Sequence, residues 1–256
     1  MPPFRSLALA ALGALVLVAE PGNSKAWADD TSIAVAANFT EPAKEIAQLF
    51  EDKTGHPVLL SFGSTGQFYI QIKQEAPFAV LLAADGETPK KMVDEGLAMA
   101  NSRFTYAVGR LVLWGKNPKV PAGEAVLKSG AFEKLAVANP ALAPYGAAGL
   151  ETLHKLGVYE ALAPKLVQGN NIAQTFEFVS SGNADLGFVA LSQVITKAEG
   201  QYWLVPASLY SPIFQDAVLL HKGAEDPVAK AFLEFLRGPE ALKVIEKYGY
   251  GTASAG

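Results

Sequence analysis

Short apolar runs alternate with segments of helical periodicity along most of this chain. Three early runs, at 31–37, 58–62 and 78–83, are apolar almost throughout and show no regular alternation with polar residues. Strands of this kind are typical of a parallel sheet with helices on both of its faces. The sequence therefore predicts an α/β fold. Further strands are expected at 106–114, 135–138, 165–167, 187–191 and 214–220, and helices at 41–53, 67–72, 88–95, 147–156, 173–180, 228–237 and 240–248.

Four junctions that lead into predicted helices carry small or polar residues: 37–40 (ANFT), 63–66 (GSTG), 144–146 (PYG) and 170–172 (NNI). In open α/β sheets, ligands bind beyond the carboxyl ends of the strands, where such loops lie. A helix N-terminus presents about four unpaired N–H donors and a partial positive charge of roughly half a unit. It therefore accepts an anion without Lys or Arg. Ordinary N-capping by Ser, Thr or Asn is the alternative explanation of each junction taken singly.

The first 28 residues have the three parts of an export signal. Arg5 supplies the charge, residues 7–19 form an apolar run, and residues 26–28 (AWA) form a cleavage site. The apolar run has 13 residues, against about 20 needed to span a bilayer, which disfavours a membrane anchor. We expect cleavage after Ala28 and a mature protein in the periplasm.

Charge and cysteine content narrow the classes of partner. Without Arg5, Lys25 and Glu20, the 21 basic and 25 acidic residues become 19 and 24, a formal net charge of −5. This balance disfavours nucleic acid and anionic membranes as partners. The chain has no cysteine, which excludes disulfides, thiolate metal sites and a lipidated cysteine.

Motifs for catalysis are missing from the sequence. There is no GxxxxGK[ST], GxGxxG or GxSxG pattern, and His56, His154 and His221 lack metal-ligand spacing to one another. Asp85 follows a predicted strand and Asp185 lies in a predicted turn, so capping explains both better than acid/base chemistry does. A secreted α/β hydrolase remains the less favoured alternative to a binding protein.

Five sequence blocks, in this order, resemble the periplasmic molybdate-binding proteins of ABC importers. The blocks are VAANFTEP at 35–42, FGSTGQFYIQI at 62–72, APFAVLLAADGETPKKMVDEG at 76–96, NPALAPYGAAGLETLHKLG at 139–157 and GNADLGFVALSQV at 182–194. The resemblance covers nearly all of the chain after the signal peptide. It implies the two-lobed type II solute-binding fold, in which each lobe is a mainly parallel sheet flanked by helices and the ligand lies in the cleft between the lobes.

The resemblance also implies lobe boundaries. Lobe 1 would comprise residues 29–107 and 212–256, and lobe 2 residues 108–211, with crossovers near 106–110 and 210–214. The protein would be a monomeric carrier, not an enzyme, that delivers molybdate or tungstate to a membrane permease. It would need no cofactor, because molybdenum would be bound only as its oxyanion.

Carried over by motif, the residues that would bind the oxyanion are Asn38 through its side-chain amide, Thr65 with its neighbour Ser64, and the main chain of Tyr145 and of Ile172. Ala37 is a further candidate. Many members of the family have a Tyr where this chain has Ala190, and a small residue where it has Tyr145. The resemblance therefore implies that the Tyr145 hydroxyl replaces the missing phenol. Sulfate or phosphate is the alternative ligand.

Overall fold

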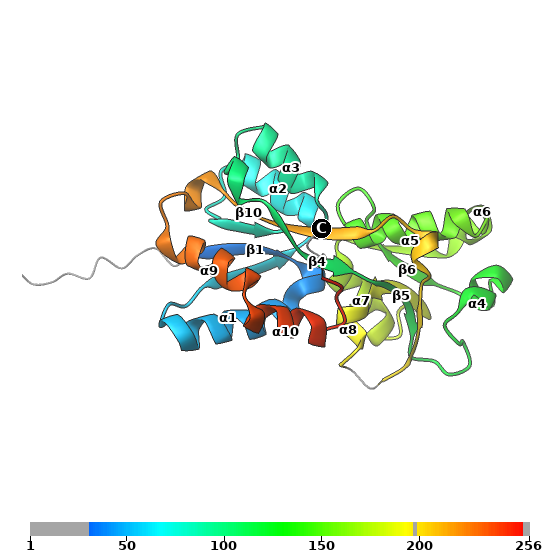
Figure 1. The fold of residues 1–256 in the computed structure, drawn as a ribbon. Coiled ribbons are helices and arrows are strands. Elements are labelled where there is room, and N and C mark those ends of the chain that lie inside the picture. Colours follow the sequence, from blue (N-terminus) through cyan, green and yellow to red (C-terminus); the bar gives the residue numbers. More distant parts are fainter. Residues whose placement is uncertain (1–30, 197–198, 253–256) are drawn as a thin grey trace, which may run out of the picture.

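The computed structural model describes residues 31–196 and 199–252, and within them the chain forms two lobes (Figure 1). Each lobe is built on a five-stranded mixed sheet flanked by helices. The predicted signal peptide, 1–28, lies outside the described residues. None of the helices in the described ranges is long and apolar enough to cross a membrane.

The first sheet has the strand order β2-β1-β3-β10-β4. Strand β1 pairs in parallel with β2 and β3, whereas β10 runs antiparallel to both β3 and β4. The strands are β1 (Ser32–Ala36), β2 (Leu59–Gly63), β3 (Val80–Leu82), β4 (Phe104–Gly109) and β10 (Ile213–Leu219), and the helices of this lobe are α1 (Thr40–Thr54), α2 (Thr65–Lys73), α3 (Glu87–Asp94), α9 (Pro227–Arg237) and α10 (Pro239–Lys247).

The second sheet repeats this plan in the order β7-β6-β8-β5-β9. Strand β6 pairs in parallel with β7 and β8, and β5 runs antiparallel to β8 and β9. The strands are β5 (Leu111–Gly115), β6 (Leu135–Ala138), β7 (Leu166–Gly169), β8 (Leu186–Ala190) and β9 (Gln201–Leu204), and the helices are α4 (Glu124–Ser129), α5 (Pro144–Lys155), α6 (Tyr159–Leu162), α7 (Ile172–Ser180) and α8 (Leu191–Val194).

The prediction of a single strand across 106–114 is wrong. Strand β4 ends at Gly109 in the first sheet, and β5 begins at Leu111 in the second, so the chain passes between lobes at Arg110. It returns before β10 begins at Ile213. Strands β5 and β10 each enter a sheet from the other lobe, which explains why both run antiparallel to their neighbours. The lobe boundaries at 107/108 and 211/212 stay a prediction.

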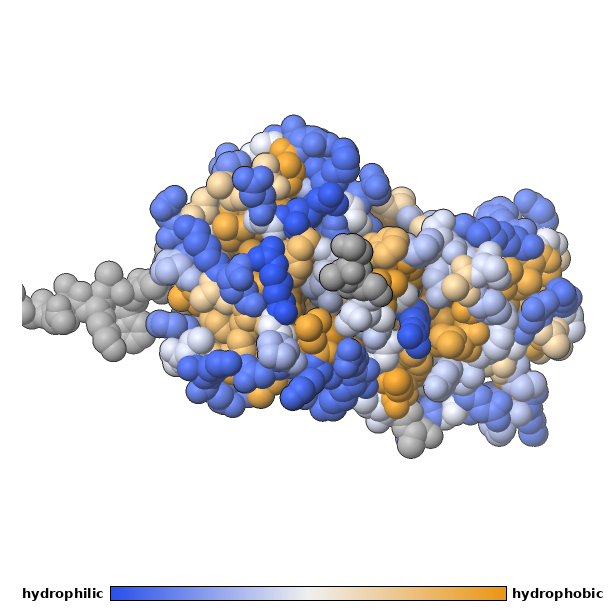
Figure 2. Space-filling view, viewed as in Figure 1, coloured by the Kyte–Doolittle hydropathy of each residue, from blue (hydrophilic) through white to orange (hydrophobic). Residues whose placement is uncertain are grey.

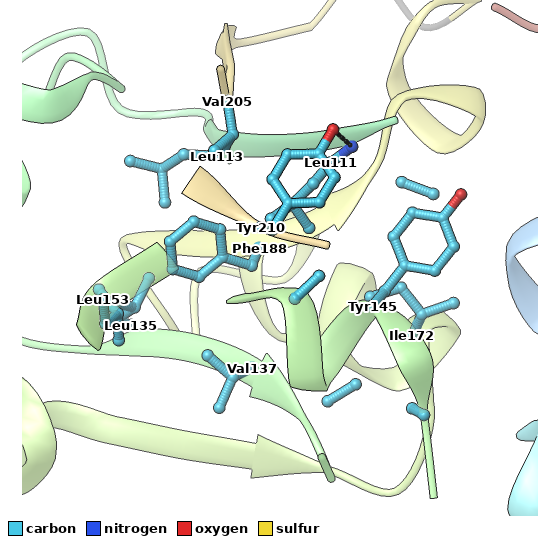
Figure 3. Packing of buried hydrophobic residues seen from close by; sticks show 14 of the residues in the cluster. Leu111, Leu113, Leu135, Val137, Tyr145, Leu153, Ile172, Phe188, Val205 and Tyr210 are labelled. Atoms are coloured by element: carbon cyan, nitrogen blue, oxygen red, sulfur yellow. Dashed lines mark hydrogen bonds between the residues drawn. The ribbon is translucent and has the colours of Figure 1, made fainter. Parts of the chain in front are cut away.

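Each lobe has its own apolar core. In the first, Ile33, Phe39 and Phe232 are fully buried between the sheet and its helices. In the second, Phe188 is fully buried, pairs with Leu113 in the middle of β5 and lies against Gly149 of α5. Figure 3 shows Tyr145 at the edge of this second cluster, beside Ile172, with its hydroxyl directed away from Phe188. Hydrophilic residues cover the helices on the outside of both lobes (Figure 2).

Candidate functional site

A small cavity of about 10 Å³ lies where the two lobes meet. All four polar junctions contribute to its walls, two from each lobe. Among the residues that line it, none is Lys, Arg, Asp or Glu. The lining residues are Ala36, Ala37, Asn38, Gly63, Ser64, Thr65, Ala84, Ala143, Pro144, Tyr145 and Ile172. The structure therefore brings together all six residues predicted from the sequence, and their role as ligand contacts stays a prediction.

The GSTG junction begins helix α2 with a capping box. The Ser64 hydroxyl accepts a hydrogen bond from the Gln67 N–H at 3.3 Å, and the Gln67 side chain accepts one from the Ser64 N–H at 3.2 Å. A serine hydroxyl also carries one hydrogen that it can donate. Because its oxygen is already held by Gln67, the Ser64 hydroxyl is left with that hydrogen for the cavity.

The hydroxyl oxygen of Thr65, like that of Ser64, already accepts a hydrogen bond from the protein main chain. The Thr65 hydroxyl oxygen accepts a 2.9 Å hydrogen bond from the N–H of Ala84, two residues beyond β3, and Thr65 is almost fully buried. In the first turn of α2, Gly66 donates across the lobes to Leu142, and Gln67 donates to Ser64. Among the described residues, this leaves Thr65 with both its N–H and its hydroxyl hydrogen as donors for the cavity.

The second lobe supplies two helix starts. Pro144 has no N–H, and Gly146 donates to Ala143 at 2.8 Å, so Tyr145 carries the first free N–H of α5. At the start of α7, Asn171 caps the helix by accepting from the Gln174 N–H at 3.0 Å. The N–H of Ile172, two residues earlier in the chain, takes no part in that bond. Two helix termini from each lobe thus direct N–H groups and partial positive charge at one cavity.

The Asn38 side chain differs from the expectation that its amide donates to a ligand. Its Nδ2 donates to Gln215 Oε1 at 3.0 Å and to the Tyr250 hydroxyl at 2.9 Å, which uses both amide hydrogens. The main-chain carbonyl oxygen of Asn38 accepts from the Tyr250 hydroxyl at 2.7 Å and from the Ser192 hydroxyl at 2.8 Å. What Asn38 has left for the cavity is its main-chain N–H, at the start of the 3₁₀ turn Ala37–Phe39.

A buried polar network continues from Asn38 into the second lobe. Gln215 Oε1 also accepts from the Tyr106 hydroxyl at 3.0 Å, and Gln215 Nε2 donates to the Tyr145 hydroxyl at 3.0 Å. Burial raises the pKa of Tyr145 and of Tyr106 well above the usual range. Burial also raises the pKa of Tyr250, while its side-chain hydrogen bonds with Ser192, Asn38 and Tyr145 lower it. These phenols are therefore neutral donors at physiological pH.

Sequence reasoning missed Gln215, Ser192 and Tyr250. The available signal was Gln215 itself, a polar residue within the otherwise largely apolar strand 213–219 that proves to be fully buried. Ser192 and Tyr250 carry no comparable signal, because they meet Asn38 only through the tertiary fold.

None of the other titratable candidates is among the residues that line the cavity. The ring of His154 stacks on Tyr159 with 4.1 Å between centroids, and Asp85 accepts a 2.7 Å hydrogen bond from the N–H of Thr88, as the capping interpretation predicts. Asp185 accepts from the N–H groups of Glu133 and Lys134. Within the described ranges, no group of three or more His, Cys, Asp or Glu side chains is arranged to hold a metal ion.

Residues 31–251 match the family model for bacterial extracellular solute-binding proteins. The chain belongs to this family. The chain is similar to the molybdate-binding protein ModA of Rhodobacter capsulatus, at 59% identity over 228 residues that cover 89% of this chain and 90% of the relative. The ModA protein of Azotobacter vinelandii is 55% identical over 230 residues, covering 88% and 91%.

A solved solute-binding protein supports the fold. The Azotobacter vinelandii periplasmic molybdate-binding protein superposes with a TM-score of 0.85 and 38% identity, covering 88% of this chain and all of its own. The type II fold expected from the sequence, with two lobes and a cleft between them, is confirmed by this match together with the two sheets.

Proposed function

We propose that this protein captures molybdate or tungstate in the periplasm and delivers it to the permease of an ABC importer. The observation that carries the proposal is a cavity between the lobes that four helix N-termini face and that only uncharged residues line. Relatives named as molybdate-binding proteins, at 59% and 55% identity over nearly their whole length, support the choice of ligand.

Neutral donors are sufficient for such a ligand. The donors assigned to the cavity are the N–H groups of Asn38, Thr65, Tyr145 and Ile172 and the hydroxyls of Ser64, Thr65 and Tyr145. A hydrogen bond to a charged acceptor contributes about 1.5–3 kcal/mol net, and each helix terminus adds roughly 0.3–1 kcal/mol. Micromolar affinity corresponds to about 8 kcal/mol and nanomolar affinity to about 12 kcal/mol. Seven donors reach this range without a cation.

The donor set also favours a fully deprotonated anion. A partly protonated ion such as hydrogen phosphate needs an acceptor for its hydrogen, and no carboxylate lines the cavity. Molybdate, tungstate and sulfate carry equal charge, so discrimination among them rests on size. The larger metal oxyanions would contact donors from both lobes that sulfate would leave too distant.

Lobe closure is the second part of the proposal. The hydrogen bond from Gly66 to Leu142, at 2.9 Å, joins the two lobes directly beside the cavity. A Cβ at Gly66 would lie 2.9 Å from the Cα of Leu142, so only glycine allows this approach. Ligand binding would favour this closed arrangement through a hinge at the two chain crossovers, and the closed surface would be what the permease recognises.

Isothermal titration of the chain from Asp29 onward with molybdate, tungstate and sulfate tests the function. We expect binding of the first two and weak or no binding of sulfate. Thermal melting provides a second measure, because a ligand at 100 times its Kd adds about 2.7 kcal/mol to the free energy of unfolding. Stabilisation by sulfate or phosphate, but not by molybdate, would replace the proposal with its alternative in the same fold.

A further inference from the structure

Gln215 occupies a position that none of the predicted ligand contacts explains. It lies on β10, two residues after that strand enters the first lobe, and its side chain is fully buried. The pairing of β10 with β4 shifts register between Gln215 and Asp216. Such a bulge re-aims side chains. Gln215 contacts Tyr145 across the lobes, while Asp216 pairs with Arg103 at 2.8 Å.

The Asn38 amide orients the side-chain amide of Gln215. Its carbonyl oxygen, Oε1, accepts from Nδ2 of Asn38 and shares the Tyr106 hydroxyl hydrogen with the main-chain oxygen of Ala83, and its Nε2 donates to the hydroxyl oxygen of Tyr145. Because a phenol has a single hydrogen, a Tyr145 oxygen that accepts from Gln215 keeps its own hydrogen free to donate elsewhere. That hydrogen has two destinations, the hydroxyl of Tyr250 or an anion in the cavity.

The space around this contact is kept open by a glycine. A Cβ built at Gly109, the last residue of β4, would collide with the Tyr145 hydroxyl and lie 2.8 Å from Nε2 of Gln215. Gly109 does not have a positive φ, so its backbone does not require glycine. The requirement comes from the hydrogen bond between the lobes.

We infer that Gln215 is a positioning residue, which crosses from the first lobe to hold the Tyr145 hydroxyl with its hydrogen available to the bound oxyanion when the lobes close. This inference rests on the proposed function. Gln215 does not touch the anion, and it acts through Tyr145. Closure and donor orientation are thereby coupled, because the Gln215 to Tyr145 bond requires both lobes in place.

The first test is a pair of substitutions measured by molybdate titration. Gln215→Leu removes the donor and should weaken binding roughly tenfold or more, the effect of one lost hydrogen bond to an anion. If Gln215 acts through Tyr145, the double variant with Tyr145→Phe should bind little more weakly than Tyr145→Phe alone. Strictly additive losses would overturn the inference.

The second test uses Gln215→Glu. If Gln215 had a purely structural role, the molybdate affinity of this variant would not depend on pH. A protonated carboxyl can donate to Tyr145 as Nε2 does, whereas an ionised one accepts the Tyr145 hydrogen and repels the dianion. The affinity of this variant for molybdate should therefore fall as pH rises from about 5.5 to 8, since burial raises a carboxyl pKa towards this range. The wild-type Kd should stay constant. Other titratable or charged groups near this position are Tyr106, Tyr145, Tyr250, Asp85, Asp216 and Arg103, and the wild-type titration accounts for them.

Two further variants keep the outcome decisive. Gln71→Glu, on the exposed side of α2, makes the same change in net charge and should leave the pH profile flat. Gly109→Ala should weaken binding even if Gln215→Leu fails to fold, because it wedges the same contact. A wild-type protein that binds none of the oxyanions would overturn the proposed function as well. If the wild-type protein binds molybdate and the Gln215 and Gly109 variants bind it with the same affinity, only this inference is overturned.

Discussion

The N–H of Ala84, two residues beyond β3, donates a 2.9 Å hydrogen bond to the hydroxyl oxygen of Thr65 at the start of α2. This bond fixes the hydroxyl as an acceptor towards the protein and a donor towards the cavity. Thr65→Val should therefore weaken molybdate binding about 10- to 100-fold, while Thr65→Ser should bind almost as wild type. Titration calorimetry on both variants measures the difference.

A control separates this effect from general destabilisation. Thr65→Val also leaves the Ala84 N–H without a partner, which costs about 1–3 kcal/mol of stability. Thr152 is likewise fully buried, with its hydroxyl donating to Ala148 inside α5. Thr152→Val should leave molybdate affinity unchanged. Equal losses of affinity in both valine variants would mean that Thr65 does not act as a donor to the ligand.

Ala190 and Tyr145 share the core cluster of the second lobe, and Ala190 is fully buried. Introducing the phenol that the family resemblance leads one to expect there, as Ala190→Tyr, should overpack this region and lower the free energy of unfolding by about 1–3 kcal/mol or more. Adding Tyr145→Ala should recover part of the loss, because it vacates volume in the same cluster. Urea denaturation measures both. A single Ala190→Tyr variant as stable as wild type would contradict the prediction.

Asp85 gives the stability a defined pH dependence. Burial raises the pKa of this carboxyl above 3.8, and nearby Asp216 adds to the shift, although hydrogen bonds from Thr88 oppose it. The folded protein therefore holds this proton more tightly than the unfolded chain does. The group's contribution to stability is present in acid and is lost as pH rises from the unfolded to the folded pKa.

Substitution of Asp85 checks that sign. Asp85→Asn keeps an acceptor for the Thr88 N–H and removes the ionisation. At pH 7 its free energy of unfolding should therefore be at least that of wild type, and it should lack the fall in stability above about pH 4. Asp85→Ala loses the cap and should be about 1 kcal/mol less stable. Denaturant titrations across pH test this. A larger fall with rising pH in Asp85→Asn than in wild type would refute it.

Arg103 pairs with an Asp216 carboxylate that is only 5% exposed, and Thr105 donates to the other oxygen at 2.6 Å. Arg103→Ala should lower the free energy of unfolding by about 1–3 kcal/mol, because it leaves a buried charge with one partner fewer. Lys90→Ala breaks an exposed pair with Asp94 and should cost less than about 0.5 kcal/mol. Molybdate affinity should be unchanged in both variants.

The positions of the helix starts could be predicted from the sequence, and the hydrogen bonds between lobes could not. The GSTG junction predicts the start of α2, because the spacing of Ser64 and Gln67 is that of a capping box. Asn38 illustrates the limit. Its place at a helix start was expected, but the destination of its amide depends on Gln215 and Tyr250, which lie 177 and 212 residues away in the chain.

The break at Arg110 was missed for a related reason. Residues 106–114 are continuously compatible with a strand, and hydropathy does not distinguish one long strand from two that belong to different sheets. The short elements α4, α6, α8 and β9 were also missed. Each has six residues or fewer, too few for a periodic pattern to develop.

The bond from the Gly66 N–H to the Leu142 carbonyl has a consequence for kinetics. Because donor and acceptor belong to different lobes, this amide is shielded from solvent only while the lobes are together. The deuterium exchange rate of the Gly66 amide would thus measure the fraction of molecules in which the lobes are open. The Gly66 amide, although it lies in the first turn of α2, thus reports on lobe opening and not on contact with the ligand.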